Sequence, residues 1–155
     1  MWERLKIGDT LVEYDAEATR DMYAKDKGGI NSCNCEYCVN YRLVRDEVYP
    51  ADFRHLLTQL GIDSCKEVEL DHITEDDSED GPSYGQSVWG TYGFIGRVLE
   101  SEDSAGTLGA SGFDYQVVSG HQVHPVTRAH FGNSPEVLDL NFWVPYVPKA
   151  NTTPQ

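Results

Sequence analysis

A chain of 155 residues, 39% hydrophobic and 25% charged, has the length and composition of one globular domain and is too short for two comfortable cores. Its 26 acidic and 12 basic residues give a formal net charge of -14, which disfavours binding to nucleic acid or to an anionic membrane through a general basic surface. No stretch is apolar and long enough for a signal peptide or a membrane span, so we expect a cytoplasmic protein.

The first residues predict a β-hairpin followed by a helix. Residues 4–8 and 10–14 each carry alternating apolar side chains, and the Gly-Asp pair between them suits a tight turn. Asp15 is placed to cap a helix over residues 16–25, which the Gly-Gly pair at residues 28 and 29 ends. We expect these elements to begin the domain.

Two more helices are predicted in the next part of the chain. Between residues 35 and 48, apolar side chains recur on one helical face, at Tyr37, Tyr41, Val44 and Val48. A third helix has Pro50 in its first turn and ends at Gly61. Its apolar face consists of Phe53, Leu56, Leu57 and Leu60. We expect this face to pack on a sheet.

A period of two replaces the helical pattern after residue 65. Val68 and Leu70 alternate with acidic residues, which predicts a strand with one solvent-facing side. Residues 71–80 then hold six carboxylates and no basic residue, which indicates an exposed loop. We expect five of its side chains to contact a basic protein partner: Glu75, Asp76, Asp77, Glu79 and Asp80.

The rest of the chain favours strands. They are expected over residues 87–99, 115–118 and 137–147. No helical pattern follows residue 61. Helices in the N-terminal half and strands in the C-terminal half predict an α+β domain, with the helices covering one face of a mostly antiparallel sheet. We expect a single domain over residues 1–147 and a flexible tail over residues 148–155.

Three of the four cysteines lie within six residues, in the stretch SCNCEYCVNY that begins at residue 32. If a helix starts near Cys35, then Cys35 and Cys38 share its first turn, and Cys33 in the lead-in can fold over them. The amides and dipole at a helix N-terminus favour the thiolate form, which both binds zinc and attacks disulfides. The cluster is thus consistent with a metal site, a redox pair or buried thiols.

A structural zinc site needs four ligands, so this cluster requires one more. The candidates for the fourth ligand are Cys65, His55 and His72. Our predicted ligand set is Cys33, Cys35, Cys38 and Cys65. The redox alternative depends on the C-x-x-C pair, but a polar, glycine-broken segment precedes it, where a thioredoxin-like protein has a buried strand.

Histidines in the segment GHQVHPVTRAH offer a second candidate cluster. His121, His124 and His130 would meet only if the chain turned at Pro125, because residues three apart in a strand point to opposite faces. We therefore expect no site there. An enzyme could instead use a cleft lined by these histidines and by Trp89, Tyr92 and Trp143.

One part of the chain resembles a group of uncharacterised bacterial proteins. The pattern consists of C-x-C-x-x-C-x-N-Y from Cys33, a Tyr-Pro pair at residues 49 and 50, FRHLLTQLGID from Phe53 and KEVEL from Lys66. It covers residues 33–70. The resemblance implies a bacterial cytoplasmic protein and transfers no catalytic residue.

The sequence contains no H-E-x-x-H motif, no G-x-S-x-G motif and no phosphate-binding glycine loop. We therefore expect a non-catalytic protein-binding or regulatory domain, of an immunity-like kind, with a structural zinc at the cysteine cluster. The competing hypothesis is an enzyme that uses the cysteines, for thiol redox or metal-dependent chemistry, or the aromatic and histidine-lined cleft.

Overall fold

The structure, a computed structural model, describes residues 2–26, 28–72, 87–101 and 112–151. Its strands are β1 (Glu3–Ile7), β2 (Thr10–Tyr14), β3 (Glu69–His72), β4 (Val88–Ser101), β5 (Asp114–Val118) and β6 (Val137–Val144). Its helices are α1 (Ala16–Ala24), α2 (Glu36–Val48), α3 (Ala51–Leu60) and α4 (Pro125–Phe131), with short 3₁₀ helices η1 (Gly29–Ser32) and η2 (Gly120–Gln122).

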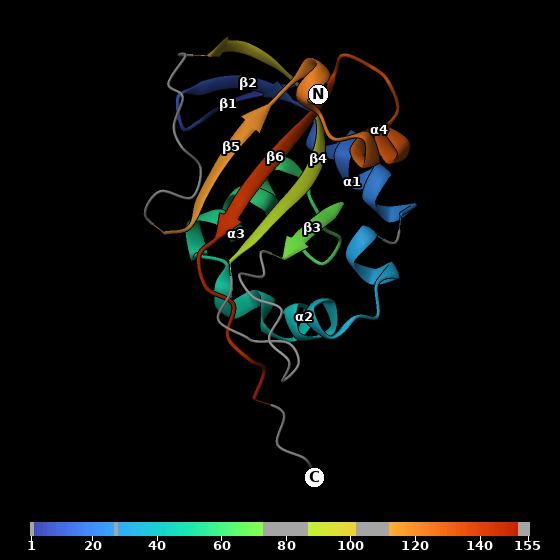
Figure 1. Cartoon of the computed structure of the whole chain (residues 1–155). Coiled ribbons are helices and arrows are strands. Elements are labelled where there is room, and N and C mark those ends of the chain that lie inside the picture. The colour runs from blue at the N-terminus through green and yellow to red at the C-terminus, as the bar shows by residue number, and fades with distance from the viewer. Residues whose placement is uncertain (1, 27, 73–86, 102–111, 152–155) are drawn as a thin grey trace.

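All six strands join one antiparallel sheet. Five of them follow the order β1-β2-β4-β6-β5. The remaining strand, β3, pairs with the same edge of β4 as β2 does, but at the opposite end of this long strand. Helices α1 to α3 precede most of the strands, and Figure 1 shows the long β4 and β6 at the centre of the fold. The predicted α+β class with a mostly antiparallel sheet is confirmed.

Helices α2 and α3 cover one face of the sheet and form the core with it. The apolar face predicted for α3 is buried, and Phe53 lies 5.4 Å from Phe142 of β6, between ring centroids. At the end of α3, Gly61 has a φ of 83°, a left-handed conformation that favours glycine. The predicted third helix and its glycine cap are therefore confirmed.

Helix α1 fills a gap along the edge of β4. Between the segments of β4 that pair with β2 and β3, the backbone of β4 meets α1 in place of a strand. The Asp15 amide donates to the Ile95 carbonyl at 3.0 Å, and the Ile95 amide donates to the Thr19 hydroxyl at 2.9 Å. The Tyr23 hydroxyl donates to the Gly93 carbonyl at 2.7 Å. Side chains of a helix thus satisfy backbone groups that a neighbouring strand would otherwise pair.

Helix α4 corrects two expectations from the sequence. It lies after residue 61, where no helix was expected, and it packs on the opposite face of the sheet from α2 and α3, against Gly93. A side chain at Gly93 would collide with Thr127 and Phe131 of α4, so this glycine allows the close approach. The helix is only seven residues long, which is too short for a clear helical period in the sequence.

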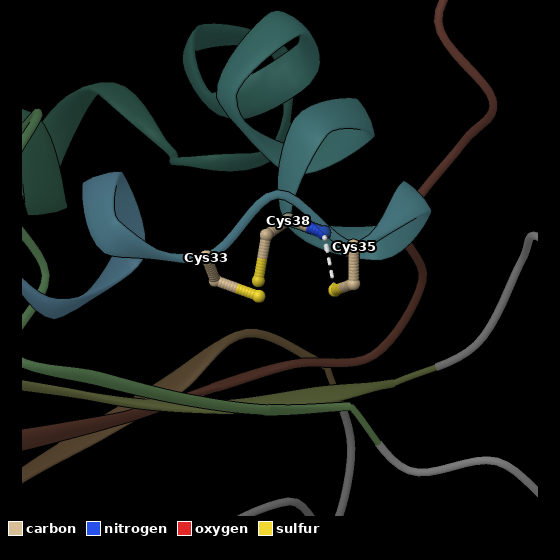
Figure 2. A group of neighbouring side chains, drawn as sticks. All are labelled: Cys33, Cys35 and Cys38. Carbon is tan, nitrogen blue, oxygen red and sulfur yellow. Dashed lines mark hydrogen bonds between the residues drawn. The ribbon is translucent and has the colours of Figure 1, made fainter.

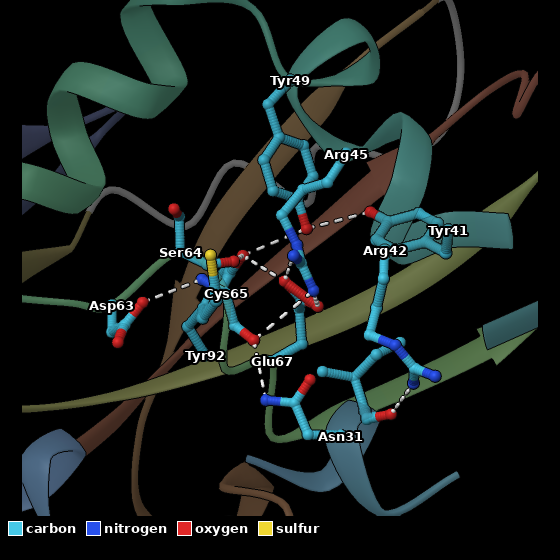
Figure 3. Close-up of polar contacts among 11 residues, drawn as sticks. Asn31, Tyr41, Arg42, Arg45, Tyr49, Asp63, Ser64, Cys65, Glu67 and Tyr92 are labelled. Carbon is cyan, nitrogen blue, oxygen red and sulfur yellow. Dashed lines mark hydrogen bonds and ion pairs between the residues drawn. The ribbon is translucent and has the colours of Figure 1, made fainter. Parts of the chain in front are cut away.

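The side chain of Glu67, expected on the solvent-facing side of a strand, is instead completely buried. The strand begins only at Glu69, so strand alternation does not determine where Glu67 points. Its carboxylate accepts two hydrogen bonds from Arg45 of α2, at 2.6 and 2.8 Å, and lies 2.8 Å from the Tyr92 hydroxyl (Figure 3). A buried ion pair thus joins α2 to the chain that enters β3.

Part of the predicted flexible tail is attached to α2. The Asn40 side chain donates to the Pro148 carbonyl at 2.9 Å and accepts from the Ala150 amide at 2.7 Å. Residues 152–155 lie outside the described residues. Within the described part of the chain, no helix has the length and apolar character needed to cross a membrane.

Candidate metal centre

The three clustered cysteines come from the junction between η1 and α2. Cys33 directly follows η1, Cys35 is the N-terminal cap of α2, and Cys38 lies in the first turn of that helix. Their sulfur atoms all lie within 4.8 Å of one another (Figure 2). The predicted convergence is confirmed, and this group of side chains could hold a metal ion.

The electrostatics of the cluster differ from one sulfur to the next. The backbone amide of Cys35 lowers the pKa of Cys33, whereas burial raises the pKa of Cys38. The Sγ atom of Cys35 accepts a hydrogen bond from the Cys38 amide at 3.4 Å. Amide donors at the start of a helix stabilise thiolates, and a metal cation would favour deprotonation of the buried Cys38 as well.

His72, at the end of β3, approaches the same cluster. Its Nε2 atom lies 3.7 Å from the Cys38 Sγ atom, and its ring contacts Tyr37 and Tyr41 of α2 at centroid distances of 5.2 and 6.3 Å. Zinc–sulfur and zinc–nitrogen bonds of about 2.3 and 2.0 Å in a tetrahedron place two such ligand atoms roughly 3.5 Å apart. Burial lowers the pKa of His72 and so favours the neutral imidazole, the form that binds metal.

Arg42 holds the segment that leads into the cluster. Its guanidinium group donates to the Ile30 carbonyl at 2.6 Å and to the Cys33 carbonyl at 2.8 Å. The Ile30 amide in turn donates to the Glu67 carbonyl at 3.2 Å, so the lead-in is attached both to α2 and to the chain before β3. These hydrogen bonds to backbone carbonyl groups place Cys33 beside the first turn of α2.

The structure does not bring Cys65 to the other three cysteines, which corrects the predicted ligand set. Among the described residues, the group of converging ligand atoms contains only Cys33, Cys35 and Cys38. Cys65 has an exposed side chain in the turn after α3, where its amide donates to Asp63 at 3.0 Å. His55 is exposed on α3. Of the three candidates for a fourth ligand, His72 contacts one member of the cluster, Cys38, but its nitrogen atoms are not within 4.8 Å of all three sulfurs.

The three C-terminal histidines do not form a cluster of converging ligand atoms in the described part of the chain. His121 is exposed in η2, His124 caps the start of α4, and His130 forms an ion-pair contact with Asp26.

The prediction that Trp89, Tyr92 and Trp143 line one cleft is wrong for Tyr92. Trp89 and Trp143 face each other across β4 and β6, with ring centroids 4.9 Å apart. Tyr92 lies on the other face of the sheet, completely buried against α2 and α3. Alternation along β4 separates Trp89 from Tyr92, because residues three apart in a strand point to opposite faces.

The five acidic residues expected to contact a partner, Glu75, Asp76, Asp77, Glu79 and Asp80, lie outside the described residues.

Comparison with known proteins finds no matching family model, no similar curated protein and no similar solved structure. The resemblance to an uncharacterised bacterial group stays a prediction.

Proposed function

We propose that this protein is a non-catalytic binding domain stabilised by one zinc ion, with Cys33, Cys35, Cys38 and His72 as the four ligands. The observation that carries the metal site is the convergence of three sulfurs within 4.8 Å. The His72 imidazole nitrogen, 3.7 Å from the Cys38 sulfur, is the proposed fourth donor and would have to move closer to the other two sulfurs on metal binding. Three thiolates and one imidazole form a closed tetrahedral set of the kind found in structural zinc sites, which leave no open position for substrate.

A zinc ion in this position would act as a structural cross-link. It would join the neighbouring end of η1 and first turn of α2 to the end of β3, which lies far from both in the sequence. Metal binding to the folded state alone stabilises that state by mass action, about 4 kcal/mol when free zinc is 1,000-fold above its dissociation constant. The zinc would therefore hold β3 against α2.

The redox alternative has less support from the geometry. Helix η1 and not a buried strand precedes Cys35, so the pair lacks the thioredoxin-like context. A histidine nitrogen beside the buried thiol is a suitable metal ligand. The reducing cytoplasm, where we expect this protein, keeps thiols available for zinc.

Metal analysis of the untagged protein, purified without added metal, tests the zinc site directly. We expect about one zinc per chain in the parent protein, and a loss of most of it in Cys35→Ser and His72→Ala. Matched controls are Cys65→Ser and His55→Ala, which remove the same kinds of side chain away from the cluster. Fully folded parent protein without zinc would contradict the proposal, and so would equal zinc loss in the controls.

Chelation separates a structural zinc from one that is only bound. Incubation with a strong chelator should lower the midpoint of thermal unfolding of the parent protein, and added zinc should restore it. The zinc-deficient His72→Ala variant should respond much less to either treatment. An unchanged midpoint after complete zinc removal would show that the ion does not stabilise the fold.

A further inference from the structure

The face of the sheet opposite α2 and α3 carries a row of polar and aromatic side chains. Strand register places Thr91 opposite Asn141, and their side chains are hydrogen-bonded at 2.9 Å. Because paired residues in antiparallel strands point to the same side, Glu69 of β3 shares this face with Thr91. Trp89 and Trp143 form the next pair on this face, two residues further along β4 and β6. Helix α4 covers only the neighbouring part of this face, around Gly93.

A cleft of about 380 Å³ lies on this face. Its walls consist of side chains from β3, β4 and β6 and from the segment that leads into α4. The acidic residues that line it are Glu69, Asp71 and Asp139, and Trp89 forms an aromatic wall. The volume is sufficient for one long side chain of a partner or for a small molecule.

Asp139 provides a buried carboxylate in this cleft. The residue has 0% of its surface exposed. One carboxylate oxygen, Oδ2, accepts a hydrogen bond from the His124 amide at 2.5 Å. The other, Oδ1, is equally buried and lies beside the Thr127 hydroxyl of α4, although neither atom makes a hydrogen bond of good geometry to the described residues. An ionised Asp139 would therefore add negative potential to the cleft from within the protein, without touching a ligand itself.

The carboxylates that line the cleft are its permanent charges, and His124 is a titratable base in its wall. No lysine or arginine lines it. Within the described part of the chain, neither Glu69 nor Asp71 forms an ion pair. The two side chains are half-buried and exposed, respectively, so both remain accessible from solvent. Carboxylates that share a concave surface without a counter-charge attract a cation, and the concave shape strengthens the local potential.

Trp89 adds a second feature that favours a cation. Its indole is partly exposed and packs edge-on against Trp143, with an interplanar angle of 65°. Trp gives the strongest cation–π attraction of any side chain, and a planar guanidinium group can stack on it. The same guanidinium group offers its N–H donors in a fork that matches a carboxylate.

We infer that this cleft binds the guanidinium group of an arginine side chain presented by a protein partner. The inference deepens the binding part of the proposed function and does not depend on zinc. The guanidinium plane would stack on Trp89 while its N–H groups donate to the accessible carboxylates of Glu69 and Asp71. A basic segment of the partner would also complement the net charge of -14.

Two short peptides test the inference on the intact, zinc-replete protein. The first is N-acetyl-Gly-Arg-Gly-amide, and the second replaces arginine by citrulline, which keeps the shape and removes the charge. Nuclear magnetic resonance titration should show saturable shifts of the Trp89 and Trp143 indole signals with the arginine peptide, while Trp2 serves as an internal reference. A single side chain should bind with a dissociation constant of roughly 1 mM, and the citrulline peptide at least about tenfold more weakly.

A matched pair of charge-neutralising variants locates the site. Glu69→Gln should weaken arginine-peptide binding about tenfold, equivalent to about 1.4 kcal/mol, because it removes a charge from the cleft. Glu47→Gln, at an exposed position of α2, makes the same change in net charge and should alter binding less than about twofold. Equal effects of the two variants would overturn the inference, because they would indicate attraction to the overall charge.

Equal affinity for the citrulline peptide would also overturn the inference, since it would mark the cleft as a site for neutral ligands. So would the absence of saturable binding up to about 10 mM arginine peptide, roughly tenfold above the expected dissociation constant. Zinc content, measured on the same samples, separates the two proposals. A zinc-replete protein that fails to bind the arginine peptide contradicts only the cleft, and a zinc-free protein that binds it contradicts only the metal site.

Discussion

Arg45 of α2 and Glu67, just before β3, form a two-bond ion pair inside the core, with Nε–Oε1 and Nη2–Oε2 distances of 2.6 and 2.8 Å. The side chain of Glu67 is 0% exposed and that of Arg45 only 7%. Hydroxyl groups of three buried tyrosines continue the network, since Tyr41 and Tyr92 both lie within hydrogen-bond distance of Tyr49 (Figure 3).

Removal of one member of this pair should be strongly destabilising. Arg45→Met leaves a buried carboxylate without its counter-charge, so we expect a loss of about 3–5 kcal/mol in the free energy of unfolding, measured with urea. The control is Arg54→Met at an exposed position of α3, which should change it by less than about 0.5 kcal/mol. The double variant Arg45→Met, Glu67→Leu should recover part of the loss, because it leaves no buried charge. If the double variant loses as much free energy of unfolding as Arg45→Met and Glu67→Leu lose separately when added together, Arg45 and Glu67 do not interact.

The packing of α3 on the sheet predicts that a buried leucine contributes more to stability than an exposed one. Leu57 is 1% exposed, so Leu57→Ala should lower the free energy of unfolding by about 2–5 kcal/mol. Leu43→Ala is the matched control, because Leu43 lies in α2 with 60% of its surface exposed and should cost less than about 0.5 kcal/mol. Chemical denaturation of both variants measures the difference. Similar losses would contradict the packing of α3 on the sheet.

The contact between α1 and the edge of β4 predicts a loss on substitution of Thr19. In Thr19→Val, the partly buried Ile95 amide loses the oxygen that accepts its hydrogen bond at 2.9 Å, so we expect about 1–3 kcal/mol of destabilisation. Thr58→Val is a control of the same chemistry at an exposed position in α3. Hydrogen exchange of the Ile95 amide should also accelerate in Thr19→Val alone. An unaffected exchange rate would argue against α1 as the partner of this part of β4.

Burial of Asp139 predicts a specific pH dependence. Burial raises the pKa of this carboxyl group, and the His124 amide, the Thr127 hydroxyl and the charges of His124 and Arg128 only partly oppose the rise. A folded-state pKa above the unfolded value of about 3.9 means that the folded protein holds the proton more tightly. The contribution of Asp139 to stability is therefore fully present below that unfolded value and is lost as pH rises through the folded-state pKa.

Urea unfolding of the parent and of Asp139→Asn between about pH 4 and pH 7 measures this contribution. The asparagine does not titrate, so the stability of the parent minus that of the variant should fall as pH rises. Glu136→Gln, which removes a partly exposed carboxylate nearby in the sequence, is the control for the change in net charge. A difference between parent and Asp139→Asn that rises with pH would mean that the folded protein favours the charged carboxylate.

Local pattern in the sequence accounted for most of the elements. The hairpin, helices α1 to α3 and the strands of the C-terminal half all have periods or turn residues that a short window of sequence reveals. The convergence of Cys33, Cys35 and Cys38 was also predictable, because a helix start brings residues one turn apart together. Helix α4 was missed because its seven residues are too few to show a period.

That His72 lies beside Cys38, while Cys65 lies away from the cluster, came only from the tertiary structure. So did the burial of Glu67 and the cleft that gathers Glu69 and Asp139. An alternating pattern in LDLNFW, which puts Asp139 and Asn141 on the face opposite Leu138 and Leu140, was the available signal for a polar patch on the sheet. It gives no sign of which strand or helix lies beside that face.

The sequence by itself therefore determined most of the elements, the α+β class and the meeting of three cysteines, because each depends on backbone geometry over a few residues. The tertiary structure decided the partner of each isolated polar side chain: Arg45 for Glu67, Thr19 for the Ile95 amide and Cys38 for His72. These pairs join segments 22 to 76 residues apart. Such contacts depend on how the helices pack on the sheet and on which strands pair, and local periodicity carries no information about either.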